Sequence, residues 1–299
     1  MSTLRTIEEE ITELQNIRNV LEIYESVSAT YMRRTRGSII KSRAFYESLR
    51  GTYDEVTHAY RYELAEIKNK TSIWQSIFWK KLINRVRRRT EAAVWLSANT
   101  GLYGDIIQKT FQAFLEHLSS TKCDVIIVGK RGKLLFEERM PHTRYIYQDL
   151  PDTVSRMEDL SPLLTLFSRY QRIRVFYGKF ESFVSQFPIS TMIGESEQPV
   201  SMSTKEEYAP HTAVRYLFEP SLEEISRFFE TEIRVSLFQQ ITEESRLAKL
   251  AARMYQLDAA TEGIGNKLTG IIFERHRLQH QLENKKQLEI VQSRMAMNI

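Results

Sequence analysis

The stretch Leu247–Leu282, LAKLAARMYQLDAATEGIGNKLTGIIFERHRLQHQL, decides the architecture of this chain. Its apolar residues recur in alternating steps of three and four, the spacing of a heptad seam along one face of a long helix. The seam positions are Leu247, Leu250, Met254, Leu257, Ile264, Leu268, Ile271, Leu278 and Leu282, with Thr261 and Arg275 filling the two remaining steps. The pattern predicts a long helix that pairs with a second helix.

Three glycines, Gly263, Gly265 and Gly270, lie within this helical pattern. Each is expected to cost roughly 0.5–1 kcal/mol relative to alanine in a helix interior. We expect them where the helix packs closely against its partner, because small residues let two backbones approach. A helix break at Gly263 and Gly265 is the alternative.

The N-terminal region carries a seam of the same type. Its positions are Leu4, Ile7, Ile11 and Leu14, followed by a three-residue slip through Ile17 and then by Leu21, Tyr24 and Tyr31. Such a slip is a stammer, which overwinds a coiled coil locally. No proline precedes Pro141, so a continuous helix over the first 60 residues is predicted, about 90 Å long at about 1.5 Å per residue.

The middle of the chain alternates strand-like and helix-like segments. The apolar run at 92–96 ends in turn residues, and helical spacing covers Ile106–Leu118. The uninterrupted apolar run Val125–Val128 is typical of a buried parallel strand. A helical pattern at Leu160–Tyr170 and a strand at 172–182 follow. This alternation predicts a small layered α/β domain.

The last part of the chain returns to helix. Residues 195–212 form a polar connection, and residues 213–220 are expected to form one more strand. Ser221 is the expected N-cap of the final long helix, with Glu224 at the capping-box position. We therefore divide the chain into an N-terminal helix (1–60), a connecting segment (61–90), an α/β domain (91–220) and a C-terminal helix (221–299).

Composition narrows the class of protein. The 299 residues include 42 basic and 38 acidic side chains, so a net charge of +4 does not favour general nucleic-acid binding. The single cysteine, Cys123, fits a reducing compartment. The N-terminus has neither the apolar core of a signal peptide nor the composition of a transit peptide, and no window is apolar enough to span a bilayer.

The sequence contains no recognisable catalytic motif. The motif GLYGD at Gly101–Asp105 lacks the Lys-Ser/Thr ending of a phosphate-binding loop and is expected to be a strand-to-helix turn. His276 and His280 share a helix face without a third metal ligand nearby in sequence. We assign no catalytic residue, no cofactor and no metal.

The segment 61–89 differs from the rest of the chain in its strong positive charge. It holds nine basic and two acidic residues, with an apolar face that includes Trp74 and Phe78. A basic amphipathic helix can lie on an anionic membrane or bind an acidic partner. The candidates for contact with a membrane-embedded partner are Trp74, Phe78, Lys80, Lys81 and Arg85. The alternative is a helical extension that packs on the α/β domain.

Several short sequence motifs, taken in their order along the chain, resemble those of one protein family. The run QNIRNVLEIYESVSATYMRRTRGSIIKSRAFYESLR (residues 15–50) matches, without gaps, the N-terminal word of the gamma subunit of rotary F-type ATP synthases. The words GLYGD, IIVGKRGK, VFYGKF and YLFEP resemble later words of that family, and AARM at Ala251–Met254 followed by LDAAT resembles its C-terminal word. The words run from residue 15 to residue 261 and so cover most of the chain.

The resemblance implies a rotor without catalytic residues. In the family, the antiparallel coiled coil of the two terminal helices turns inside a ring of alternating alpha and beta subunits that carry the nucleotide sites. The Rossmann-like α/β domain contacts an epsilon-type subunit and the membrane ring of c-type subunits. The resemblance therefore implies a peripheral membrane protein on the cytoplasmic face of a bacterial or archaeal inner membrane, part of an ATP synthesis and proton transport complex.

Five arginines are candidates for contacts with the surrounding subunits in this arrangement: Arg33, Arg34, Arg36, Arg253 and Arg277. A solvated helix face is the alternative for each of them.

The chain departs from the family at positions that would contact catalytic subunits. Glu22 and Tyr24 replace the Lys and Met of the family's N-terminal word, and near the C-terminus Arg277 is among the few family-typical residues. A gamma-like rotor of a specialised ATPase not used for synthesis is therefore one alternative. A coiled-coil scaffold with an α/β head that associates with its own copies is another.

Overall fold

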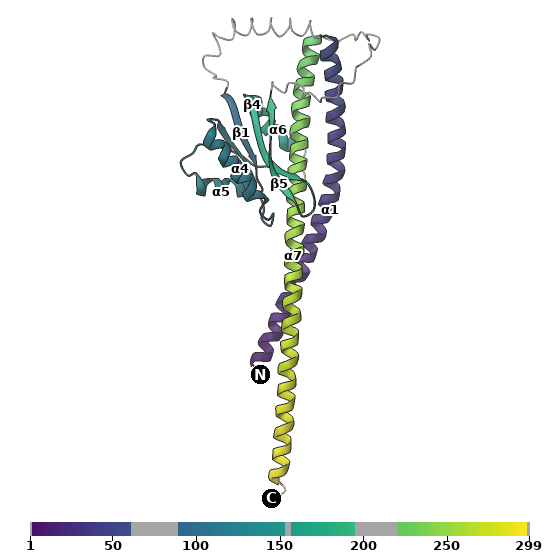
Figure 1. Cartoon of the computed structure of the whole chain (residues 1–299), viewed down its shortest axis with the longest axis vertical. Helices are drawn as coiled ribbons and strands as arrows, with labels where there is room; N and C mark the ends of the chain where they lie inside the picture. The colour runs from purple at the N-terminus through teal and green to yellow at the C-terminus, as the bar shows by residue number, and fades with distance from the viewer. Residues whose placement is uncertain (1, 61–88, 153–156, 195–220, 298–299) are drawn as a thin grey trace. The chain divides into compact units, whose positions relative to one another are not determined.

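The computed structural model describes residues 2–60, 89–152, 157–194 and 221–297. They form two compact units, one of residues 1–31 with 253–299 and one of residues 32–252. Two helices contribute to both units: α1 (Ser2–Ala59), of 58 residues, and α7 (Leu222–Met297), of 76 residues (Figure 1). Both are continuous, as their sequence patterns predicted.

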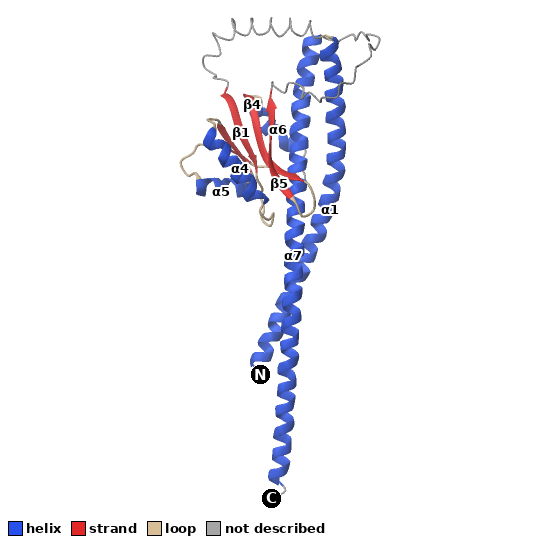
Figure 2. Cartoon of the chain, viewed as in Figure 1, coloured by secondary structure: helices blue, strands red, loops and turns tan. Residues whose placement is uncertain are grey.

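The larger unit contains a five-stranded sheet (Figure 2). Its strands are β1 (Arg89–Leu96), β2 (Asp124–Val128), β3 (Ile146–Gln148), β4 (Tyr170–Phe180) and β5 (Gln186–Gly194). The spatial order is β3-β2-β1-β4-β5; the first four strands are parallel and β5 pairs antiparallel with β4. In the register, Val94 of β1 lies between Ile126 of β2 and Val175 of β4. A mostly parallel, Rossmann-like sheet with long terminal helices confirms the predicted fold class.

Three shorter helices belong to this unit: α4 (Ile106–Ser120), α5 (Lys130–Arg139) and α6 (Met157–Phe167). Alternate residues of β1 point to opposite faces of the sheet. On one face, Ala93 and Trp95 pack with Phe114 of α4 and Phe136 of α5. On the other face, Val94 belongs to the same core cluster as residues of α6 and α7, including Leu163 and Phe238. Helices therefore cover both faces of the sheet, which is why residues 92–96 of β1 and 125–128 of β2 form uninterrupted apolar runs.

The turn before α5 and the first turn of that helix each require a glycine. Gly129 has a φ of +101°, and a Cβ there would lie 2.8 Å from the carbonyl oxygen of Ala98. A Cβ on Gly132 would lie 2.5 Å from the Cβ of Ser97. These two glycines let the start of α5 lie directly against the residues that follow β1.

Several local predictions are confirmed. The motif GLYGD forms a strand-to-helix turn, with Leu102 and Gly104 at positive φ before α4 begins at Ile106. Ser221 caps α7 through its Oγ, which accepts a hydrogen bond from the backbone N–H of Glu224 at 3.3 Å.

Other local predictions were incomplete or wrong. The sequence patterns missed α5, β3 and β5, and the helix expected at 160–170 ends at Phe167, since Tyr170 already begins β4. Strand β5 contains Pro188, which a sheet accepts in an edge strand. The connection expected at 195–212 and the strand expected at 213–220 lie outside the described residues.

In the smaller unit, α1 and α7 pack through an apolar seam. Ile11 and Leu14 of α1 are buried with Leu268 of α7, and Lys267 forms an ion pair with Glu10 at 3.1 Å. Every seam position predicted from Leu247 to Leu282 along α7 is buried or half-buried, including Thr261 and Arg275. The heptad prediction for α7 is confirmed.

The seam predicted on α1 is wrong at two positions, since Ile17 is 42% exposed and Tyr24 is 52% exposed, whereas its other positions are buried or half-buried. Both expectations for the glycines were wrong. The helix continues through Gly263, Gly265 and Gly270, and a Cβ on any of them would meet no described neighbour within 4 Å. These glycines lie away from the α1–α7 interface, so they allow no closer approach of the two helices in this unit.

Candidate functional site

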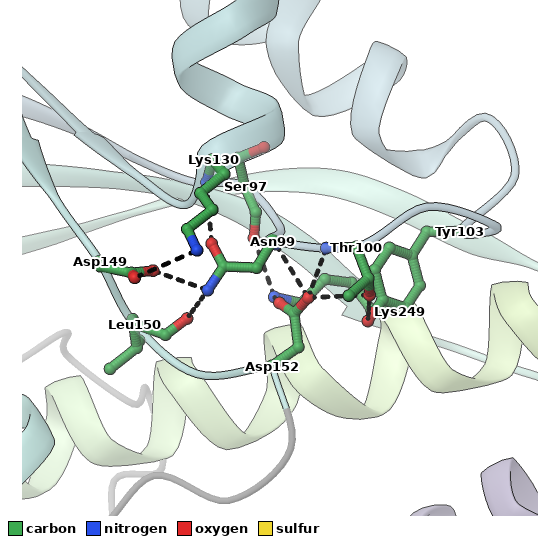
Figure 3. Close-up of polar contacts among 9 residues, drawn as sticks. All are labelled: Ser97, Asn99, Thr100, Tyr103, Lys130, Asp149, Leu150, Asp152 and Lys249. Atoms are coloured by element: carbon green, nitrogen blue, oxygen red, sulfur yellow. Dashed lines mark hydrogen bonds and ion pairs between the residues drawn. The ribbon is translucent and has the colours of Figure 1, made fainter.

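Polar side chains gather at the carboxyl ends of the three strands β1, β2 and β3 (Figure 3). Ser97, Asn99 and Thr100 follow β1, Lys130 follows β2, and Asp149 and Asp152 follow β3. In doubly wound sheets this edge is where ligands commonly bind, near the point where the strand order reverses. A binding site in this domain is therefore expected at this edge.

Asn99 joins the three loops at this edge. Its Nδ2 donates to the Oδ1 of Asp149 at 2.7 Å and to the carbonyl oxygen of Leu150 at 3.0 Å. Its Oδ1 accepts a hydrogen bond from the backbone N–H of Lys130 at 2.8 Å. The loops after β1, β2 and β3 are thus held together by one amide side chain.

Asp152 and Lys249 complete the cluster. One carboxylate oxygen of Asp152 accepts hydrogen bonds from the backbone N–H groups of Asn99 and Thr100, at 2.8 and 2.9 Å, and from the Thr100 hydroxyl at 3.1 Å. Its other oxygen lies 3.5 Å from the Nζ of Lys249 on α7, which also donates to the carbonyl oxygen of Ser97 at 2.9 Å. The side chains of Lys249 and Asp152 are only 13% and 8% exposed.

Burial and charge act in opposite directions on Asp152. Burial raises the pKa of its carboxyl group, but the Lys249 ammonium and the donors of Thr100 and Asn99 lower the pKa by more, so that it lies below its ordinary value. The carboxylate is therefore ionised at neutral pH and carries the negative charge that faces Lys249.

The crevice at this edge is filled from within the protein. The cavity next to the cluster has a volume of about 10 Å³, room for about one water molecule, and is lined by residues that include Leu96, Asp152 and Arg246. In the part of the chain that the structure describes, α7 lies where a Rossmann-type domain would bind a nucleotide. The cluster can fasten a helix to a sheet, and the cavity beside it is too small for a nucleotide.

A second set of polar contacts joins α1 to α7 within the larger unit. Arg43 forms an ion pair with Glu244 at 3.0 Å, and the hydroxyl of Tyr53 donates to Glu230 at 3.1 Å. The Tyr53 ring also lies 5.6 Å from that of Phe229. Higher residue numbers on α1 pair with lower numbers on α7, so the two helices run antiparallel here.

Comparison with known proteins is decisive at this point. A family model described as ATP synthase matches residues 3–292. The ATP synthase gamma chain of Cytophaga hutchinsonii is 25% identical over the full length of both chains. The chain belongs to the ATP synthase gamma-chain family.

The fold of the chain is similar to that of solved ATP synthase structures. One is a chain of the Euglena gracilis mitochondrial ATP synthase in an assembly with its c-ring, with a TM-score of 0.64, 15% identity, and coverage of 99% of this chain and 95% of that one. Another, from the rotor of the same organism's ATP synthase, has a TM-score of 0.59 and 14% identity, and covers 94% of this chain and 99% of that one.

The structure places four of the five arginines predicted for this gamma-family chain on exposed helix surfaces. Arg33, Arg34 and Arg36 lie on α1 in the larger unit, and Arg277 lies on α7 in the smaller unit. Arg253, on α7 at the start of the smaller unit's C-terminal segment, is half-buried and makes contacts of its own. The role of all five as contacts with other subunits stays a prediction.

The five candidates for contact with a membrane-embedded partner, Trp74, Phe78, Lys80, Lys81 and Arg85, lie outside the described residues. Of the helices described, none combines the length and the apolar content needed to cross a bilayer. Among the described residues no three His, Cys, Asp or Glu side chains gather as a metal site would require.

Sequence reasoning missed Lys249 and Asp152. A signal for Lys249 was present, since it is the one charged residue in the otherwise apolar run LAKLAA that begins the decisive stretch. A lysine between two seam leucines would be expected to reach solvent, and its burial depends on the sheet that α7 packs against. Asp152 carried no local signal, because its partners come from residues 99, 100 and 249.

Proposed function

We propose that this gamma-family chain is the central rotor shaft of an F-type ATP synthase or ATPase. It would couple ion flow through a membrane ring to conformational change at catalytic sites on surrounding beta subunits. The observation that carries this proposal is the pair of continuous helices, of 58 and 76 residues, each of which has part of its length in the same unit as the α/β sheet. A helix that continues without a break can carry torsion from one end to the other.

The filled crevice supports a role without catalysis. The edge of the sheet where Rossmann-type domains bind nucleotides is occupied by Lys249 and its partners. The chemistry would then belong to other subunits, and this chain would transmit motion between them.

The exposed surface of the helices supports contact with surrounding subunits. On α1, Ile17, Val20, Tyr24 and Val27 are spaced by three, four and three residues, and each is at least 42% exposed. This spacing places them on one face of the helix. A rotor can drive its partners only by contacting them differently at different angles, since coupling requires differential interaction with each state. Because this part of α1 is apolar on one face, it would present a different surface to a given partner at each angle of rotation.

The partners in this proposal are the alpha and beta subunits of a catalytic ring, an epsilon-type subunit and a membrane ring of c-type subunits. The similar Euglena chains support this set, because one comes from an assembly with a c-ring and the other from a rotor. The chain would be a peripheral membrane protein on the cytoplasmic face of a bacterial or archaeal inner membrane, attached through the segment 61–90.

The test is purification of the tagged chain from its own cells, followed by mass measurement and subunit counting. The proposal expects three catalytic NTPase subunits for each copy of this chain. A homo-oligomer without an NTPase would contradict it and favour a coiled-coil scaffold with an α/β head.

One observation favours a second candidate, a gamma-type rotor of a specialised ATPase. Glu22 and Tyr24, which depart from the family pattern, are both exposed, and Glu22 forms an ion pair with Arg18 at 2.9 Å. The surface offered to the catalytic subunits at this position thus carries an ion pair and an aromatic ring. ATP synthesis by vesicles that contain the purified complex, driven by an imposed proton gradient, separates the two candidates; the specialised ATPase would hydrolyse ATP and synthesise none.

A further inference from the structure

Three features characterise the contacts around Lys249 on α7. Its ammonium is buried, it is paired with a buried carboxylate, and it bonds to a strand end through the carbonyl oxygen of Ser97. By comparison, Lys267 of α7 pairs with Glu10 at 3.1 Å, but their side chains are 59% and 44% exposed. Exposed pairs of that kind contribute little to holding two elements in place.

The network behind Asp152 spreads this attachment over three strands. Asp152 binds the loop after β1, and Asn99 links that loop to the residues that follow β2 and β3. A force on Lys249 therefore reaches the ends of β1, β2 and β3 through hydrogen bonds that are already satisfied in the structure (Figure 3).

The packing around Lys249 brings α7 close to the sheet. Ala248 and Ala251 are fully buried, and a Cβ built on Gly178 of β4 would lie 3.5 Å from the Cβ of Ala248. The free energy gained by such apolar contacts is non-directional. A buried, hydrogen-bonded ion pair has directional geometry and fixes one register of the helix on the sheet.

We propose that Lys249 and Asp152 form the torque-bearing joint between α7 and the α/β sheet, positioning residues through which rotation of one is carried to the other. This inference rests on the proposed rotor function and deepens it. At the edge of the sheet where Rossmann-type domains bind ligands, the Lys249 ammonium instead attaches α7 to the sheet.

The test compares ATP-driven proton pumping with ATP hydrolysis in membrane vesicles that carry the whole complex. Lys249→Met keeps the length of the side chain and removes its charge. Asp152→Asn keeps an oxygen that can accept the hydrogen bonds of Asn99 and Thr100 but removes the charge that faces Lys249. Lys249→Arg retains the cation. Lys109→Met, which breaks the exposed pair with Asp105 at 2.7 Å on α4, is the matched control.

The joint predicts that Lys249→Met and Asp152→Asn assemble, keep most of their ATP hydrolysis and lose most of the protons pumped per ATP. It also predicts that Lys249→Arg recovers pumping and that Lys109→Met matches the wild type. Wild-type pumping ratios in the first two variants would overturn the joint. Failure of both to assemble, with Lys109→Met assembling normally, would also overturn it, because the pair would then serve folding alone. If the wild-type chain is found with no NTPase at all, the rotor function itself fails before any variant is compared.

Discussion

The guanidinium of Arg43 on α1 lies 3.0 Å from the carboxylate of Glu244 on α7, across 201 residues of sequence. The Arg43 side chain is 52% exposed, whereas that of Glu244 is 11% exposed. Gln240 also donates to the same carboxylate oxygen, at 3.3 Å. The contact holds the two long helices in register within the larger unit and leaves a mostly buried carboxylate dependent on a cation at the surface.

Removing this cation should destabilise the protein. Arg43→Met leaves the Glu244 carboxylate with fewer donors, and we expect the free energy of unfolding to fall by about 1 kcal/mol, since Arg43 is partly screened by solvent. Chemical unfolding of the full chain measures the change. Arg18→Met is the control, because Arg18 and Glu22 are 47% and 48% exposed and their pair should contribute less than about 0.5 kcal/mol. Equal losses in the two variants would contradict the assignment.

The three glycines of α7 should be replaceable by alanine with a gain in stability. Each is helical, and a methyl group at its Cβ position would have no described neighbour within 4 Å, so alanine adds helix propensity without a clash. We expect Gly263→Ala, Gly265→Ala and Gly270→Ala each to raise the free energy of unfolding by about 0.5–1 kcal/mol, measured by chemical unfolding. Gly132→Ala is the opposite case, because its Cβ would lie 2.5 Å from that of Ser97. A loss of stability at Gly265 would show that our account of this helix is wrong.

Asp152 should make part of the stability depend on acid pH. Because the pKa of its carboxyl group is lower in the folded protein than in the unfolded chain, its contribution is present above about pH 4 and is lost as pH falls through the folded pKa. Asp152→Asn should therefore be less stable than the wild type at neutral pH, and the difference should shrink with acidification. Thermal midpoints recorded across the acid range measure this, and a difference that stays constant with pH would rule out the linkage.

The exposed arginines should act together in coupling. Replacing Arg33, Arg34, Arg36 and Arg277 by glutamine removes four cations from exposed helix surfaces, and we expect ATP synthesis by the complex to fall while the chain still assembles. Single replacements should have little effect, because an exposed pair contributes about 0–1 kcal/mol. Arg253→Gln is made separately, since its side chain is half-buried. The control replaces the exposed Arg139 and Arg169 of the α/β unit. Normal proton-driven synthesis in the fourfold variant would refute the arginine contacts.

The basic segment is tested by replacement of its five candidate residues. Changing Lys80, Lys81 and Arg85 to glutamine and Trp74 and Phe78 to serine removes both the charge and the apolar face expected to bind a membrane-embedded partner. We expect weaker co-purification with the membrane sector. Lys68→Gln with Lys70→Gln lowers the charge of the same segment and leaves the apolar face intact. Unchanged retention of the fivefold variant would leave the segment as a helical extension of the α/β unit.

Local periodicity explains how much of the molecule could be predicted. The seam from Leu247 to Leu282 and the buried run at Val125–Val128 both depend on which residues are apolar at fixed spacing, and both are confirmed. Short elements such as α5 and β3 have too few residues to display a period. The exposure of Ile17 and Tyr24 could not be predicted, because it depends on where the partner helix lies rather than on the spacing within α1.

By itself the sequence determined that two long helices flank an α/β sheet and that the C-terminal helix carries a continuous seam. It also determined that the sequence motifs of the chain follow the order found in gamma chains. These features follow from local spacing and from residue identity. Only the tertiary structure decided the strand order, the position of the three α7 glycines away from the helix interface, and the ion pair between Lys249 and Asp152 at the end of the sheet. The physical reason is that each of these depends on which surfaces meet: a buried ion pair forms only where folding brings two distant charges together and removes the water around them.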